Sequence, residues 1–496
     1  MNAWRRILVI AAIIGITLAF ILGGVAWLLG SESTSRLLRQ LRGAKSNRED
    51  IVMRLTISRE DVVPALLKAF RRTTEPPEFR ATVLEVLLKR HLRRADDRIP
   101  ALCVEALSDP EPLVRRAAAS GLVTYLQGTP ELLTLTDHVT DPDYEVRRLV
   151  YTALLQLTEW QWRGWRGGPR AAESSALWDT LQDDPERKKN LLEACRVQME
   201  AETDEELQFL ARSVVGREIA RLCDAATEHL QRGAFEEAEA MLHEALALDP
   251  TNHRARIRLV RHYLAVGERE QALDAARRFE ALLTIPLLSK APVVDGDPTE
   301  PAWQEAFTSE RFYLTTSRWA PRRAVGKSRF YIGHYDGVIY VAILGFEDDL
   351  TKLVVTRRDR DSEIWRDDCC EIFFDPSNTE HDVAQFIINA GGVLQDSRGG
   401  IGQSAIEDFN VDCQYQAQIF YDRGYWAAEF AVEARLLEDK PITEDTLWGI
   451  NIVRTRIGAG SEHCQWWPTF GQAHNFSYFP LAVFEVRPQE AAPPAP

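Results

Sequence analysis

The stretch WRDDCCEIFFDP, residues 365–376, decides how the C-terminal part of the chain folds. Its second half alternates between two faces of a strand, so that Glu371 and Phe373 share one face while Cys370 and Ile372 point to the other. Turn-rich text separates this run from similar ones at fairly regular spacing. The further runs are VIYVAILGF, AQFIINA, YQAQIFY, WAAEFAVEA and WGINIVRTR. Short strands in this order predict an antiparallel β-sandwich.

Around these strands the sequence resembles the family 9 carbohydrate-binding modules over most of residues 291–486. The text APVVDGDPTEPAW matches the start of that family, WRDDCCEIFFDP matches its most characteristic segment, and QFIINAGG and a late WWPTF follow in order. The resemblance implies a non-catalytic sugar-binding sandwich over residues 286–487. The remaining residues, 488–496, read as a disordered tail.

The resemblance also implies a sugar site. A pyranose ring stacks its apolar C–H face on flat aromatic side chains, and its hydroxyls need fixed polar partners. Family members place a tryptophan at the position of Trp365 as one wall, and a late-loop aromatic as the other, for which Trp467 is the first choice and Phe476 stands behind it. Glu371 matches a glutamate that bonds sugar hydroxyls, and Asn389 is the next polar candidate.

Two positions depart from the family. Sugar-binding members carry a basic residue where this chain has Ile387, and a polar residue where it has Val453. Arg454 is adjacent to the second position, but strand alternation points it to the opposite face. The alternative interpretation is that Trp365 and Trp467 only cover the core of the sandwich.

The sequence predicts no enzyme and no cofactor. Glycosidases need two carboxylates about 5–10 Å apart across the sugar, whereas Asp367, Asp368 and Glu371 are neighbours on one strand. Any Ca²⁺ would be structural, without assigned residues, because no EF-hand spacing is present. A haem-carrying accessory subunit is a third hypothesis, although the domain has no Met to serve as an axial ligand.

Four of the seven cysteines fall in the sandwich. Cys369 and Cys370 point to opposite faces of one strand. Either could pair with Cys413 or Cys464 in an oxidising compartment, and buried free thiols are the equal alternative.

The preceding helical region contains two internal periods. Within residues 50–160, Asp109-Pro110 and Asp141-Pro142 lie 32 positions apart (141 − 109), and each is followed by Val-Arg-Arg. Proline ends one helix and aspartate caps the next. This pattern resembles the HEAT repeat.

The second period lies within residues 186–284. Gly233 and Gly267 are 34 positions apart (267 − 233), as are Ala238 and Ala272. This text resembles the tetratricopeptide repeat, in which small residues let paired helices approach closely. Both segments predict an α-solenoid scaffold that binds protein partners, because a single helical pair cannot bury its apolar face.

The N-terminus predicts a membrane anchor over residues 1–31. No charged side chain occurs between Arg6 and Glu32, and roughly 20 apolar residues span a bilayer. A cleaved signal peptide would have a shorter apolar region. The basic residues after this segment favour a cytoplasmic bulk, whereas the sugar-binding character of the C-terminal domain favours the periplasm or the cell exterior, which we prefer.

The charge and these segments together give the expected function. The 496 residues carry a formal charge of −15, with 74 acidic against 59 basic side chains, and nucleic-acid binders need the opposite balance. The expected protein is a multidomain α and β chain: a single-pass membrane protein that captures a glycan and binds protein partners, with no nucleic-acid partner. The alternative is an assembly scaffold whose sandwich has no sugar ligand.

Overall fold

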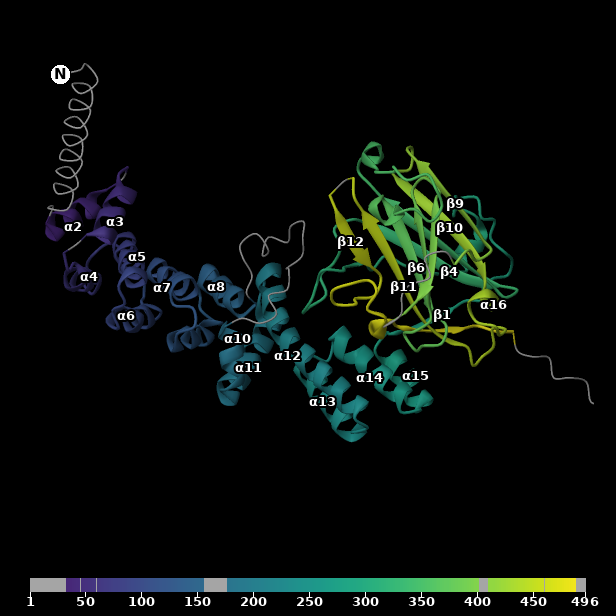
Figure 1. Ribbon diagram of the computed structural model, residues 1–496, viewed down its shortest axis with the longest axis horizontal. Helices are drawn as coiled ribbons and strands as arrows, with labels where there is room; N and C mark the ends of the chain where they lie inside the picture. The colour runs from purple at the N-terminus through teal and green to yellow at the C-terminus, as the bar shows by residue number, and fades with distance from the viewer. Residues whose placement is uncertain are drawn as a thin grey trace, which may run out of the picture. The chain divides into compact units, whose positions relative to one another are not determined.

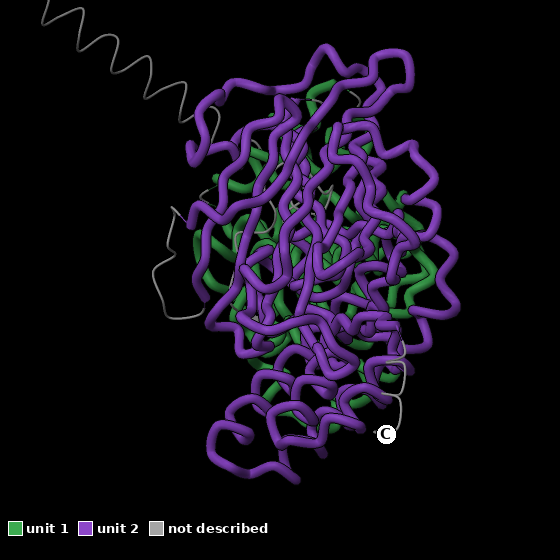
Figure 2. The backbone as a smooth tube through the Cα atoms, turned by 90° about the vertical axis from the view of Figure 1, so that its right-hand side faces the viewer, with its two compact units in different colours: residues 1–156, 172–194 green, residues 157–171, 195–496 purple. Residues whose placement is uncertain are grey.

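The chain forms two compact units, seen here in a computed structural model that describes residues 33–155, 176–400 and 409–487, apart from residues 45, 59 and 459. Figure 2 colours the units separately. Unit 1 comprises residues 1–156 and 172–194, and unit 2 comprises residues 157–171 and 195–496. The described part of unit 1 is helical, whereas unit 2 combines further helices with two β-sheets.

Unit 1 is a succession of short helices whose apolar side chains recur every three or four residues and are buried. The helices (Figure 1) are α2 (Thr34–Gly43), α3 (Arg48–Ile57), α4 (Val63–Phe70), α5 (Pro77–Arg93), α6 (Arg98–Ala106), α7 (Pro112–Tyr125), η1 (Pro130–His138), α8 (Tyr144–Leu155) and α10 (Ala176–Gln182). Helix α11 (Pro185–Ala201) contains the boundary between the two units.

Buried ion pairs join successive repeats of unit 1. Asp141 accepts hydrogen bonds from Nε and Nη2 of Arg115, both at 3.0 Å. Asp109 holds Arg80 of the preceding repeat with the same two-pronged geometry. A planar guanidinium matches a carboxylate in this way. The aspartate of each Asp-Pro turn therefore forms an ion pair with an arginine of the preceding repeat.

The helices of unit 2 after α11 are α12 (Glu205–Gln231), α13 (Phe235–Leu248), α14 (His253–Ala265) and α15 (Arg269–Arg278), with the short α16 (Ala434–Leu437) inside the sandwich sequence. Side chains cap the N-termini of α12 and α14. The side chain of Asn252 accepts hydrogen bonds from the first N–H groups of α14. Gly233 and Gly267 follow α12 and α14 with φ angles of 77° and 84°, a conformation that favours glycine. The 34-residue period thus marks two helix ends.

Two sheets pack face to face in unit 2. Sheet A has the order β1-β13-β11-β6-β7-β8, with β12 added to β11 and β3 added to β12, and sheet B has the order β2-β4-β5-β10-β9. All pairs are antiparallel except β1 with β13. The rings of Phe386 in sheet A and Phe430 in sheet B lie 4.5 Å apart between the sheets. The expectation of helical repeats followed by an antiparallel-rich β-sheet domain is confirmed.

The strands of sheet A are β1 (Leu282–Ile285), β3 (Tyr313–Leu314), β6 (Cys369–Asp375), β7 (Val383–Asn389), β8 (Leu394–Gly399), β11 (Leu447–Arg456), β12 (Glu462–Gln465) and β13 (Leu481–Phe484). Those of sheet B are β2 (Phe307–Ser309), β4 (Ser328–Tyr335), β5 (Val338–Phe346), β9 (Cys413–Phe420) and β10 (Tyr425–Glu433). Because side chains alternate, sheet A has an inner face toward sheet B and an outer face, on which Glu371 and Phe373 lie.

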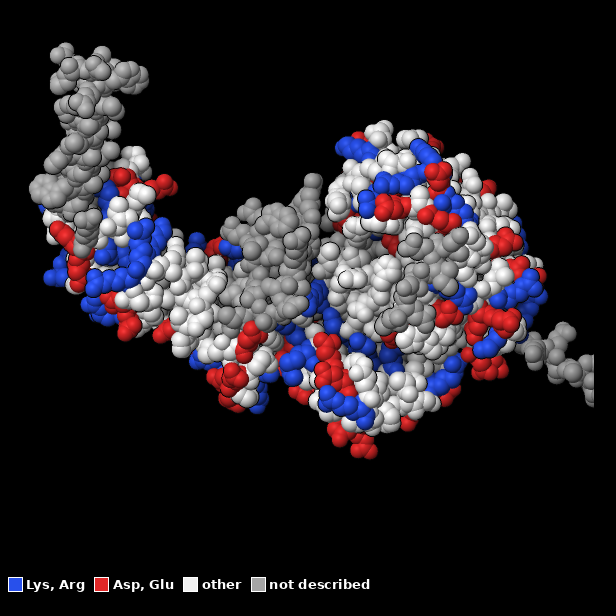
Figure 3. Space-filling model, in the orientation of Figure 1, with Lys and Arg blue, Asp and Glu red and all other residues white. Residues whose placement is uncertain are grey.

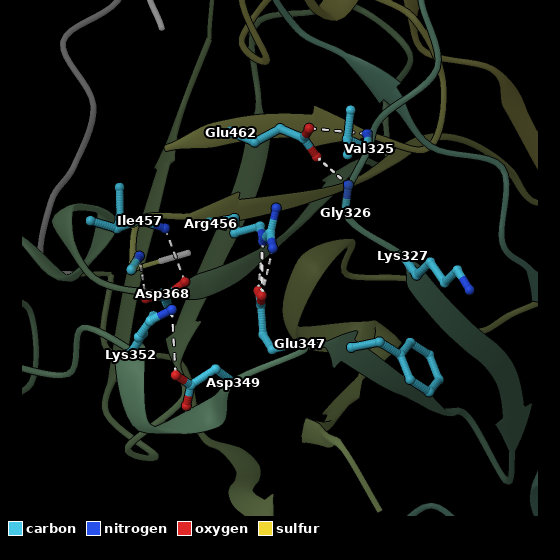
Figure 4. Close-up of polar contacts among 12 residues, drawn as sticks. Val325, Gly326, Lys327, Glu347, Asp349, Lys352, Asp368, Arg456, Ile457 and Glu462 are labelled. Atoms are coloured by element: carbon cyan, nitrogen blue, oxygen red, sulfur yellow. Dashed lines mark hydrogen bonds and ion pairs between the residues drawn. The ribbon is translucent and has the colours of Figure 1, made fainter. Parts of the chain in front are cut away.

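An ion pair is buried at one end of the sandwich. Arg454 and Glu347 are almost fully enclosed and bonded to each other, and Arg454 also donates to the carbonyl oxygen of Lys327 at 2.7 Å. Arg456 donates to both oxygens of Glu347, at 2.8 and 2.9 Å (Figure 4). Arg454, the residue beside Val453, thus points into the sandwich, where the carboxylate of Glu347 balances its charge.

The predicted single-pass membrane location is withdrawn. Across the described residues, no helix is long and apolar enough to cross a bilayer. Helix α12 has sufficient length, with 27 residues, but charged side chains such as Glu205, Arg212 and Asp224 recur along it. The anchor predicted over residues 1–31 lies outside the described residues, as does the predicted tail at 488–496.

Charges of both signs are intermixed on the described surface of the sandwich that Figure 3 shows. Ion pairs on the sandwich include Arg423 with Asp297 and Arg398 with Asp382. The visible face therefore offers no broad area of one sign among the described residues.

We expect Arg115→Gln to lower the free energy of unfolding of unit 1 by about 3 kcal/mol or more, because it leaves a buried carboxylate without its counter-charge. The side chains of Arg115 and Asp141 are only 10% and 4% exposed. Thermal unfolding of the full chain, followed by circular dichroism, measures the change. Arg98→Gln is the matched control, since Arg98 is 54% exposed in its pair and its loss should change stability much less. Equal losses would contradict this account.

Candidate functional site

Trp365 is the one predicted site residue that is open to solvent. It lies in the short helix η4 (Ile364–Arg366), before β6, and is 44% exposed. Ile364 is fully buried and anchors the helix in a cluster with Cys369. The guanidinium carbon of Arg366 lies 4.7 Å from the centre of the indole ring. One surface of the ring thus carries a cation–π contact.

The two aspartates after Trp365 hold the surrounding loops. Asp367 accepts from the backbone N–H and the hydroxyl of Thr356, at 2.9 and 2.7 Å. Asp368 accepts from the N–H group of Val354 at 2.7 Å. It also accepts from the N–H group of Ile457 at 2.9 Å, as Figure 4 shows. Both aspartates are fully buried. Their oxygens therefore support the loops and do not face a substrate.

Glu371 lies on the outer face of sheet A but is 7% exposed. Its neighbours across the strands are Val453 and Ile387. Gln385 donates to one carboxylate oxygen at 2.8 Å, and Thr455 donates to the other at 3.4 Å. Burial raises the pKa of Glu371 to about 7. The carboxyl group is thus enclosed between aliphatic side chains.

Asn389 is fully buried at the end of β7. Its amide nitrogen donates to Asp367 at 3.1 Å and to the carbonyl oxygen of Arg357 at 3.2 Å. Its oxygen accepts from the N–H groups of Gly391 and Val393, at 3.1 and 2.9 Å. These four contacts use both ends of the amide to shape the turn that follows β7.

Trp467 and Phe476 are 6% and 7% exposed. The ring of Trp467 meets that of Trp466 edge to face, with centroids 6.4 Å apart. Phe476 packs in an apolar cluster with Phe373 and Val453 on the outer face of sheet A. The structure thus places the late-loop aromatics over the sheet, where neither ring forms an open wall opposite Trp365.

Helix α14 covers this loop from the outside. The His253 ring contacts those of Trp467 and Tyr313, with centroids 5.1 and 5.5 Å apart, and burial lowers the pKa of His253 to about 4. Arg254 donates to the hydroxyl of Tyr478 at 2.7 Å. Arg261 donates to the carbonyl oxygen of Phe479 at 2.8 Å. These contacts join the helices of unit 2 to the sandwich.

A second helix approaches the sandwich equally closely. A Cβ atom added at Gly216 in α12 would lie 2.1 Å from the carbonyl oxygen of Trp319, so only glycine fits there. Arg217 lies over the ring of Trp319, with its guanidinium carbon 5.5 Å from the ring centre. The contact of helices and sandwich therefore extends along α12.

Ile387 and Val453, the two positions at which the sequence differs from the resembled family, form apolar contacts. Ile387 is 3% exposed and packs with Ile364 and Cys369. Val453 is 1% exposed and packs with Phe373 and Phe476. The outer face of sheet A is hydrophobic on both sides of Glu371.

The arginines of α14 were missed by the sequence interpretation, although the text HRARIRLVRH contained a signal. It places Arg254, Arg258 and Arg261 four and then three positions apart, on one side of a helix. A row of arginines interleaved with buried aliphatic positions indicates a buried polar interface. The pattern did not indicate which part of the chain would pack against these arginines.

Among the described residues, one group of carboxylates could be compared with a metal site. One oxygen each of Asp295, Glu300 and Glu429 lies within 4.8 Å of the others. Glu429 is fully buried and already accepts from the Trp303 indole at 2.8 Å and the N–H of Gly296 at 2.7 Å. These hydrogen bonds already satisfy the Glu429 carboxylate, and we assign no ion to the three carboxylates.

All seven cysteines are free thiols. Of the two alternatives for Cys369, Cys370, Cys413 and Cys464, the structure shows the unbridged one. Burial raises the pKa of Cys370 and of Cys464 to about 12, which keeps these thiols protonated and unreactive.

Two repeat families match parts of the chain. The tetratricopeptide repeat matches residues 229–278 and the HEAT repeat matches residues 99–128. Both kinds of repeat predicted from the sequence are therefore confirmed over these residues. No curated protein matches the chain significantly.

Solved structures give a more distant likeness. A putative carbohydrate-binding protein from Bacteroides uniformis is 13% identical, covers 41% of this chain and 99% of its own, and has a TM-score of 0.33. A carbohydrate binding module family 9 from Caldicellulosiruptor kristjanssonii in complex with cellotriose is 14% identical, with 43% and 99% covered and a TM-score of 0.32. The corresponding complex with glucose is 14% identical, with 42% and 100% covered and a TM-score of 0.31. Scores this low carry no argument about function.

We expect Glu371→Gln to flatten the pH dependence of stability. The pKa of Glu371 rises from 4.5 to about 7 on burial, so between these values the folded state keeps a proton that the unfolded chain has released. The free energy of unfolding then falls as the pH rises through this window and levels off above it. The full effect of Glu371 is on the order of 3 kcal/mol. Burial also raises the pKa of Glu429 to about 7. The contribution of Glu429 to the pH dependence of stability therefore remains in the Glu371→Gln variant.

Urea unfolding at pH 5 and pH 8 measures the effect as the difference in unfolding free energy between the two conditions. This difference should be smaller in Glu371→Gln than in the unmodified chain. Glu444→Gln, at an exposed position, is the control and should keep the original difference. An unchanged difference in Glu371→Gln would show that this carboxyl group is not held in its neutral form.

Proposed function

We propose that this protein is a non-catalytic carbohydrate-binding protein, in which a sandwich over residues 286–487 captures a glycan. Helical repeats over residues 50–160 and 186–284 hold the sandwich and bind protein partners. The single observation that supports glycan capture is the exposed indole of Trp365. The proposal differs from the site implied by the resemblance, because it uses one open aromatic surface and no closed aromatic cleft.

Exposure of the Trp365 indole has a free-energy cost. An aromatic side chain of this size buries roughly 150–250 Å² when enclosed. Leaving 44% of it in water forgoes on the order of 2 kcal/mol of hydrophobic stabilisation. The apolar face of a pyranose ring recovers part of this when it stacks on the indole. A lone exposed apolar residue is also ordinary, so binding must be measured.

Polar groups for sugar hydroxyls are present beside the ring. Arg366 and Glu363 form an ion pair at 3.2 Å, with side chains 50% and 58% exposed. They supply N–H donors and carboxylate acceptors next to the indole of Trp365. Glu371 and Asn389 are enclosed and bonded within the protein, so the proposal assigns them no contact with the sugar.

The same geometry supports a role without hydrolysis. Asp367 and Asp368 are fully buried and accept hydrogen bonds from loop N–H groups. A glycosidase needs two carboxyl groups on opposite sides of the scissile bond. Near Trp365, the residue before η4 is Glu363, whose exposed carboxylate is paired with Arg366. We therefore propose capture of the glycan without cleavage.

The second candidate is an assembly scaffold whose sandwich has no sugar ligand. The observation that favours it is the cover over the outer face of sheet A, where Trp467, Phe476 and Glu371 are each less than 10% exposed. In this interpretation α14 uses the sheet as a docking surface and Trp365 has no ligand. The two candidates differ in whether the full chain binds any sugar.

Trp365→Ala should weaken glycan binding by about tenfold or more, as expected when the central aromatic of a binding site is removed. Cellotriose and glucose, which the family 9 modules named above hold, are the first probes, followed by a glycan array. Isothermal titration calorimetry on the full chain measures the affinity. Tyr421→Ala is the matched control, because Tyr421 is 67% exposed elsewhere on the sandwich and its loss should leave the affinity unchanged. If the unmodified chain binds no glycan, the scaffold candidate replaces the proposal.

A further inference from the structure

A cleft of about 400 Å³ opens at one end of the sandwich, between the segment that precedes β4 and the end of β5. Its volume lies within the range of about 300–1000 Å³ found for ligand sites. The lining includes Glu310, Arg323, Val325, Lys327, Arg329 and Phe346. The indole of Trp365 is not part of this lining, so the cleft is separate from the surface proposed for glycan capture.

The loop at the lip of the cleft is fixed by hydrogen bonds. Glu462 of β12 accepts from the N–H groups of Val325 and Gly326, both at 3.0 Å (Figure 4). The N–H group of Ala324 donates to the carbonyl oxygen of Phe312, also at 3.0 Å. Val325 is nevertheless 82% exposed. A well-bonded backbone thus holds an apolar side chain out in water, where it can contact a ligand.

The lining carries an excess of positive charge. Arg329 is paired with Glu310, to which its Nε donates at 2.7 Å. Arg323 and Lys327 are exposed, and neither forms an ion pair with a carboxylate in the part of the chain that the structure describes. The guanidinium carbon of Arg323 lies 5.1 Å from the ring centre of Tyr313, which leaves its charge without a counter-charge. Two cations in the cleft are therefore uncompensated.

The charged groups behind the cleft balance one another. Glu347 is bonded to both Arg454 and Arg456, and Glu462 lies opposite Arg456 in the pairing of β11 with β12. Two carboxylates thus offset two guanidinium groups. Figure 4 shows the side chain of Lys327 pointing away from this group. The cleft is therefore cationic, although the chain as a whole has a formal charge of −15.

The lining suits a ligand with both a negative charge and an apolar surface. A small inorganic anion would use the cations and leave Val325 and the half-buried ring of Phe346 without a contact. A neutral sugar would leave Arg323 and Lys327 without a counter-charge. A pyranose that carries a carboxylate has C–H groups on its faces and the charge at its rim, so it uses both kinds of group.

We propose that this cleft binds a uronic acid residue of a glycan, with its carboxylate on Lys327 and Arg323 and its C–H face against Val325 and Phe346. Ammonium and guanidinium groups bind carboxylates through charge-assisted hydrogen bonds. The inference rests on the proposed capture of a glycan and adds to it a class of sugar and a second contact. Because the cleft does not include Trp365, each contact can be removed without the other.

Isothermal titration calorimetry of the full chain tests the proposal with trigalacturonic acid and its methyl ester. The ester keeps the sugar rings and removes their charge. We expect the acid to bind at least about tenfold more tightly than the ester, and its affinity to fall at high salt as ions screen the charges. Acetate at the same carboxylate concentration is the probe for a simple anion site, and it should not displace the acid.

Substitutions of opposite sign locate the site. Lys327→Gln and Arg323→Gln should each weaken binding of trigalacturonic acid about tenfold, whereas Glu310→Gln should tighten it because a repelling carboxylate is removed. Lys352→Gln is the matched control: Lys352 is 61% exposed in an ion pair, lies near the same end of the sandwich (Figure 4) and does not line the cleft. The affinity of this control should stay unchanged. Thermal unfolding confirms that each variant is folded.

The proposal fails if the acid and its ester bind equally, if neither binds, or if acetate displaces the acid. It also fails if Lys327→Gln and Lys352→Gln behave alike, or if Glu310→Gln does not tighten binding. Cellotriose titrated into the same proteins and into Trp365→Ala reports on the indole. Cellotriose binding without preference for the acid would reject the cleft alone, and preference for the acid without cellotriose binding would reject the Trp365 contact alone.

Discussion

The arginines of α14 are the constraint on which unit 2 depends. A buried guanidinium must find acceptors, because desolvation without them is costly. Arg254 finds the Tyr478 hydroxyl and the carbonyl oxygen of Arg318, and Arg261 finds the carbonyl oxygen of Phe479. These bonds hold the late loop of the sandwich between the helix and sheet A. The loop and its aromatics therefore belong to an interface inside the protein.

This interface changes where ligands can bind. In an isolated sandwich, the outer face of sheet A and the late loop would be free to form a cleft beside Trp365. Here α14 packs against Trp467, which is buried, whereas the indole of Trp365 is open to solvent.

Local features of this fold could be predicted from the sequence, and the contacts between distant segments could not. Alternation in residues 365–376 correctly predicted strand β6, and the 34-residue period located the glycines that end α12 and α14. The site was predicted by analogy with the resembled family of sandwiches. Ile387 and Val453 were the local signs that the face had become apolar. Nothing within the sandwich sequence indicated that residues 253–262 would cover it.

Hydroxyl-radical footprinting of the full chain, read by mass spectrometry, tests the covered face most directly. Oxidation rates of individual tryptophans report their exposure. The account predicts rapid oxidation of Trp365 and slow oxidation of Trp467, and faster oxidation of Trp467 when Arg254→Ala loosens α14. Equal rates for Trp365 and Trp467 in the unmodified chain would show that the helix does not close this face.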